Sequence, residues 1–132
     1  MTQIIKPIFV DEFYCEGRGP ELHKVHWAFS GHTLRAIDFM NPDESESRHL
    51  FFTGVQVVMI TPEEVINYET VDQRWIDFRP AGILDLGKSL WLESFSPQHL
   101  EKCFHYQIMF YDELFDVICE GIEVREGSYS GD

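Results

Sequence analysis

Basic residues are scarce in this chain. Ten lysines and arginines stand against 23 aspartates and glutamates, which gives a formal net charge of −13. Binding to a phosphate backbone requires a basic surface, so this composition argues against nucleic acid as a partner. The same charge would steer a basic partner protein toward the chain. The alternative is that the charge only keeps the protein soluble and has no relation to a partner.

Cysteines and long apolar runs are also few. The chain has three cysteines at wide spacing, which predict neither a disulfide framework nor a paired zinc site. Its most apolar stretch, residues 55–60, has only the length of a strand. The first residues lack the apolar region and cleavage site of a secretion signal. The sequence therefore predicts a cytoplasmic protein that does not span a membrane.

The usual motifs of catalysis are missing as well. The chain contains no glycine-rich nucleotide or phosphate loop, no Gly-x-Ser-x-Gly and no His-Glu-x-x-His. No cofactor is therefore expected, and a binding protein is favoured over an enzyme.

The chain is nevertheless rich enough in apolar residues to fold by itself. Apolar residues make up 44% of it and aromatic residues 14%, which is sufficient for one hydrophobic core at this length. We expect a single globular domain over residues 1–124 and a flexible, polar C-terminal tail over residues 125–132.

Alternation of apolar and polar residues is the main structural signal. It predicts strands over residues 23–30 and 33–40, and a hairpin formed by residues 104–111 and 115–124. Residues 41–48 are polar and acidic, which indicates a solvated loop between two strands.

Further segments have weaker signals. Residues 49–60 are predicted as one central strand in which Gly54 marks a β-bulge or a close backbone approach. Residues 74–79 and 90–95 alternate over short lengths and predict two short strands. Serine or threonine followed by proline, at residues 61–62 and 96–97, predicts the start of a short helix.

These elements together predict a mainly β protein. About seven to nine strands joined by sequential hairpins favour an antiparallel sandwich or barrel with one or two short helices. An α+β fold is the alternative.

Histidines offer a candidate metal site. His23 and His26 are three residues apart, and His32 and Glu21 lie nearby in the sequence. Residues three apart on a strand point to opposite faces, so His23 and His26 could share a metal only if this segment were helical. The alternative is that one histidine is partly buried and the other exposed.

Cys103 and His105 are the candidate catalytic residues. They lie two apart on one strand face, as a thiol nucleophile and its base would. Chance adjacency is the alternative, because no flanking signature of a nucleophile accompanies them.

All but one of the candidate binding residues gather around the last hairpin. Acidic side chains can bind cations or protect a strand edge, and large aromatic side chains either build a core or anchor an interface. The candidates are Trp75, Tyr111, Asp112, Glu113 and Asp116.

The middle third of the chain resembles small β-rich bacterial proteins of the immunity type. The resemblance lies in the hydrophobic rhythm of residues 29–38 and in Phe52-Thr-Gly-Val55, while Ser30-Gly31-His32 departs from the His-Asp that is frequent in that pattern. It implies an intracellular protein that binds and neutralises a toxin through an acidic surface, and it transfers no functional residue.

Two functions follow from the sequence. The first is a non-enzymatic intracellular binding protein with a basic protein as its partner. The second is a small-molecule-binding protein or enzyme with a site in the mouth of a β-barrel. Apolar edge strands of two copies can also pair with each other, so the sequence is compatible with a homodimer.

Overall fold

Two antiparallel sheets form the protein in the computed structural model, which describes residues 5–13, 19–66 and 82–131. The five-stranded sheet has the order β1-β6-β7-β8-β5. Its strands are β1 (Lys6–Ile8), β6 (Ile83–Asp85), β7 (Phe104–Met109), β8 (Glu113–Cys119) and β5 (Val57–Pro62). The four-stranded sheet, in the order β2-β3-β4-β9, contains β2 (Glu21–Ala28), β3 (Thr33–Met40), β4 (Arg48–Thr53) and β9 (Gly121–Glu126).

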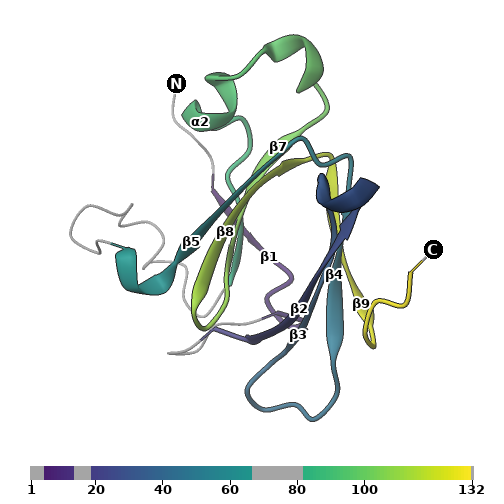
Figure 1. Cartoon of the computed structure of the whole chain (residues 1–132). Coiled ribbons are helices and arrows are strands. Elements are labelled where there is room, and N and C mark those ends of the chain that lie inside the picture. Colours follow the sequence, from purple (N-terminus) through teal and green to yellow (C-terminus); the bar gives the residue numbers. More distant parts are fainter. Residues whose placement is uncertain (1–4, 14–18, 67–81, 132) are drawn as a thin grey trace.

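The predicted mainly β fold is confirmed, and the described strands form two open sheets rather than a closed barrel. The short helical segments in the described part of the chain are η1 (Phe29–Gly31), η2 (Glu63–Val65), α2 (Leu90–Glu93) and η3 (Pro97–His99). In Figure 1, α2 lies at the upper end of the molecule and the β3–β4 loop at the lower end. No helix in the described part of the chain has the length and hydrophobicity needed to cross a membrane.

Side chains from both sheets meet in one core. Its aromatic centre is Phe13, whose ring packs edge-on against Phe39 at 4.8 Å and Phe110 at 5.3 Å between centroids. Such edge-to-face contacts add to the free energy gained from burying the rings. The buried members of this core are Phe13, Leu34, Ile37, Phe39, Leu50, Phe52, Ile83, Tyr106, Ile108, Phe110, Phe115, Val117 and Cys119.

Gly54 divides the segment that the sequence predicts as one strand, so that prediction is wrong. With a φ of 62°, Gly54 turns the chain from β4 in one sheet to β5 in the other. The chain crosses back at Glu120, between β8 and β9, and its amide donates to the Thr53 carbonyl at 2.9 Å. The two crossings lie side by side and join the sheets at one corner.

Alkaline pH is expected to destabilise this core. Burial raises the pKa of Tyr106 to about 12 and that of Cys119 to about 12. In the unfolded chain these groups ionise near pH 10 and pH 9 respectively. Their stabilising contribution is therefore complete below pH 9 and is lost as the pH rises toward 12. Urea midpoints measured from pH 8 to 11 should fall steadily above pH 9; a constant midpoint would contradict this expectation.

Candidate functional site

A cluster of polar side chains lies on the outer face of the four-stranded sheet. Ile37 and Phe39 of β3 point into the core, so the alternation of the strand directs Asp38 outward. Strand pairing places His49 of β4 directly opposite Asp38, and His26 of β2 reaches the same carboxylate from the other side. We call His26, Asp38, His49 and Phe51 the recess residues.

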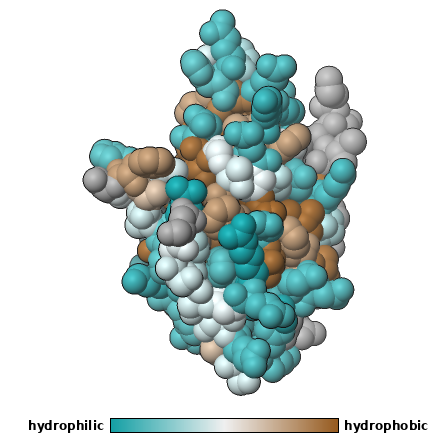
Figure 2. Space-filling model, turned by 90° about the vertical axis from the view of Figure 1, so that its right-hand side faces the viewer, coloured by the Kyte–Doolittle hydropathy of each residue, from teal (hydrophilic) through white to brown (hydrophobic). Residues whose placement is uncertain are grey.

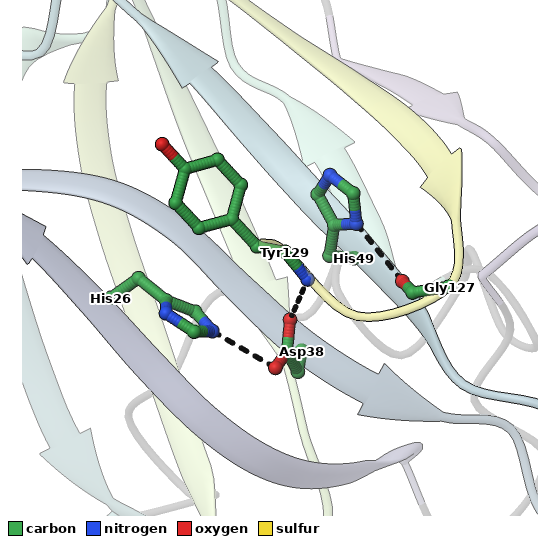
Figure 3. Close-up of polar contacts among 5 residues, drawn as sticks. All are labelled: His26, Asp38, His49, Gly127 and Tyr129. Atoms are coloured by element: carbon green, nitrogen blue, oxygen red, sulfur yellow. Dashed lines mark hydrogen bonds and ion pairs between the residues drawn. The ribbon is translucent and has the colours of Figure 1, made fainter. Parts of the chain in front are cut away.

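The end of the chain covers this cluster. After β9, residues 127–131 run back across the sheet, and we call them the C-terminal strap. The amide of Tyr129 donates to Asp38 Oδ1 at 2.8 Å, and His49 Nδ1 donates to the carbonyl oxygen of Gly127 at 2.9 Å (Figure 3). Although they point outward, Asp38 and His49 are each only 6% exposed.

The C-terminal tail predicted over residues 125–132 thus begins inside β9, which includes Arg125 and ends at Glu126. The tail carries an aromatic side chain that packs on the sheet. The ring of Tyr129 lies 5.1 Å from that of His26, 5.6 Å from that of His49 and 6.1 Å from that of Phe51.

In this cluster the Asp38 carboxylate has its hydrogen-bond partners, whereas the His49 ring lacks one. Asp38 accepts from the Tyr129 amide and, through its other oxygen, from His26 Nε2 at 2.9 Å. A carbonyl oxygen can only accept, so His49 must carry its hydrogen on Nδ1. His49 Nε2 is buried and has no hydrogen-bond partner in the described structure. In the neutral imidazole this atom is an acceptor that lacks a donor.

The candidate metal ligands do not converge. His26 binds Asp38, whereas His23 lies 3.9 Å from Glu21 on the exposed part of β2 and His32 follows η1 on the surface. Over the described ranges, no three histidine, cysteine or acidic side chains are arranged to hold a metal ion. Sequence reasoning missed His49, whose only signal is a polar residue at an alternating position of an apolar strand.

A second buried network joins the five-stranded sheet to α2. His105 Nε2 donates to Asp116 Oδ1 at 2.7 Å, and His105 Nδ1 lies 2.8 Å from Ser89 Oγ. Ser89 also caps α2, because its hydroxyl oxygen accepts from the Leu92 amide at 3.1 Å. All three side chains are about 95% buried, and the ring of Trp91 lies 4.8 Å from the His105 ring. A serine so deeply buried holds structure together and is not accessible to a substrate.

Cys103 does not take part in that network. Both nitrogens of His105 already face Ser89 and Asp116, and the Cys103 thiol lies in an apolar cluster with Leu92. Burial, and to a smaller extent the negative charge of Glu120, raise the pKa of this thiol, while Lys88 lowers it. The thiol form is therefore favoured over the nucleophilic thiolate.

Two of the candidate binding residues meet in a hollow at the lower end of the molecule. Tyr111 and Asp112 line a cavity of about 450 Å³ together with Glu21 and Glu44. A second hollow of about 350 Å³ lies on the other side of Glu44. The acidic residues that line the two hollows are Glu21, Asp43, Glu44, Glu46, Asp112 and Glu126, and the only basic residue among the described lining residues is Arg48. We call this surface the acidic end.

The remaining candidates lie elsewhere. Asp116 is buried against His105, and Glu113 begins β8, where burial and then the neighbouring Asp112 charge raise its pKa. Trp75 lies outside the described residues.

Comparison with protein-family models, curated protein sequences and solved structures finds no match to this chain.

Proposed function

We propose that this chain is a non-enzymatic protein that works inside the cell and binds a basic partner protein through its acidic end. The observation that carries the proposal is the pair of adjoining hollows around Glu44, in which acidic side chains outnumber basic ones by six to one. Such a surface attracts a partner of opposite charge and accelerates its encounter.

The acidic end also contains an anchor for specific contact. Tyr111 is 36% exposed and lines the larger hollow, and tyrosine is among the residues enriched at the centres of protein interfaces. Figure 2, viewed from the side of β4 and β9, shows hydrophilic and neutral side chains at the lower end of the molecule. Arg48 bonds Glu44 at 3.3 Å and so offsets only part of the negative charge.

This proposal agrees with the resemblance to bacterial immunity-type proteins, which neutralise a toxin by binding it. The deeply buried Ser89 and the protonated form favoured for the Cys103 thiol support a function without catalysis. The net charge of −13 supports a protein partner rather than nucleic acid.

Removing two charges from the acidic end should slow binding. We expect Glu44→Gln with Asp112→Asn to reduce the association rate of the basic protein captured by the wild-type chain by about tenfold, because long-range attraction sets that rate. The matched control is Glu93→Gln with Glu101→Gln, which removes the same charge beside α2 and η3. Surface plasmon resonance at two salt concentrations measures both rates.

Equal association rates for the two double variants would show that only the total charge matters and would remove the acidic end as the site. Failure of the wild-type chain to retain any basic protein at physiological salt would count against the proposed function itself.

A further inference from the structure

The C-terminal strap is held by the contacts with which proteins bind extended peptides. Its two hydrogen bonds to the recess residues use main-chain atoms, the carbonyl of Gly127 and the amide of Tyr129. Its side-chain contribution is one aromatic ring, which packs against His26, His49 and Phe51. Main-chain hydrogen bonds with a pocket for one side chain are a common mode of peptide recognition.

The walls of the recess do not depend on the strap. His26, Asp38 and His49 lie on β2, β3 and β4, which pair through their own backbones. Asp38 is also fixed by its hydrogen bond to His26. The strap enters from β9 through Gly127, whose φ of 76° is a backbone conformation that glycine adopts without strain. The segment can therefore leave while the sheet stays in place.

The strap does not satisfy every polar atom that it covers. His49 is 6% exposed, and its Nε2 atom lies buried without a donor. A buried acceptor without a hydrogen bond costs about 1–3 kcal/mol. A ligand that placed an N–H or O–H group against this nitrogen would gain an interaction that the strap lacks.

We propose that the recess is a binding site for an extended segment of a partner protein, and that the chain's own strap occupies it when the partner is absent. The ligand presents a main-chain carbonyl to His49, a main-chain amide to Asp38, an aromatic ring over His26 and Phe51, and a donor that reaches His49 Nε2. It displaces the strap because it completes the hydrogen bonding of His49.

This site is distinct from the acidic end. None of the recess residues lines either hollow there. The strap touches the edge of the smaller hollow through the Gly127 amide, which donates to the Ser47 carbonyl at 2.9 Å. The proposal concerns a different surface and different contacts, so it can fail or succeed independently of the proposed function.

A labelled peptide with the sequence of residues 126–132 is the probe, because it carries the contacts seen in the strap. We expect it to bind the Tyr129→Ala variant of the chain at least ten times more tightly than the wild-type chain, in which the tethered strap competes at a high effective concentration. A peptide with alanine in place of its tyrosine should not bind. Ser128→Ala, next to Tyr129 on the exposed strap, is the control and should behave as the wild type.

A second measurement uses the wild-type chain alone. The Tyr129 amide donates to a buried carboxylate, so its hydrogen exchange should be slow. The peptide lacks the extra donor for His49, so it should accelerate this exchange by mass action alone, at concentrations above the effective concentration of the tethered strap. No binding to Tyr129→Ala, equal affinity for the two chains, or an unchanged exchange rate at high peptide concentration would identify the strap as a permanent part of the fold and overturn the proposal.

Discussion

Replacing His105 with alanine is expected to lower the free energy of unfolding by about 3–5 kcal/mol. The substitution leaves the Asp116 carboxylate and the Ser89 hydroxyl buried without their shared partner. An unpaired charge in the interior costs far more than the hydrogen bond that held it. Since domains of this size are stable by only about 5–15 kcal/mol, the variant should lose a large part of its stability.

Urea unfolding of three variants separates this mechanism from a simple loss of packing. His105→Leu combined with Asp116→Leu removes the charge together with its partner and should be at least about 1 kcal/mol more stable than His105→Ala. His23→Ala removes a histidine from the exposed part of β2 and should lie within about 0.5 kcal/mol of the wild type. If the double leucine variant were the least stable of the three, the buried charge would not be the cause.

Alternation in the sequence predicted the strands that bury one face. The segments 33–40 and 104–111 contain β3 and β7, and β7 pairs with β8 as expected. The single return strand predicted over residues 115–124 is wrong, because the chain changes sheet at Glu120 and continues as β9. A period of two is decisive where one face of a strand enters a core, because a shift by one residue would expose every apolar side chain. The loop predicted over residues 41–48 was predictable for the opposite reason, since its sequence has no large apolar side chain for a core, although Asn41 is buried and Arg48 begins β4.

Local patterns failed where a single contact decides the conformation. Residues 90–95 alternate as a strand would, yet α2 forms there because the Ser89 side chain caps its first turn. The central strand predicted over residues 49–60 divides at Gly54. The positive φ that glycine adopts there carries the chain from one sheet to the other and does not form a bulge.

The candidate sites were predictable only in part. Tyr111 and Asp112 are neighbours in the sequence and share the larger hollow of the acidic end, as expected for residues of one turn. By contrast, the recess joins His26 to Asp38 across 12 residues and Asp38 to Tyr129 across 91. Successive alternating segments can indicate a pairing across 12 residues, but a single sequence shows no signal for one across 91. Asp38 and His49 stand out only as polar residues in apolar strands.

Gly19→Ala is expected to destabilise the chain by about 1–3 kcal/mol and to distort the acidic end. A Cβ atom at Gly19 would lie 2.6 Å from the carbonyl carbon of Phe110 and 2.7 Å from the carbonyl oxygen of Met109. Backbone atoms at the end of β7 cannot move aside as a flexible side chain can. The segment must shift instead, and the hydrogen bond of 2.9 Å from the Tyr111 amide to the Pro20 carbonyl would be lost with it.

Gly121→Ala is the matched control, because a Cβ atom there would meet no described atom within 4 Å. Thermal unfolding should place this control within about 0.5 kcal/mol of the wild type and Gly19→Ala well below it. The Tyr111 amide should exchange faster only in Gly19→Ala. Equal stability of the two variants would mean that the chain before β2 adjusts freely to the added methyl group. The larger hollow would then not be a fixed surface, and specific binding of a partner at the acidic end requires a fixed surface.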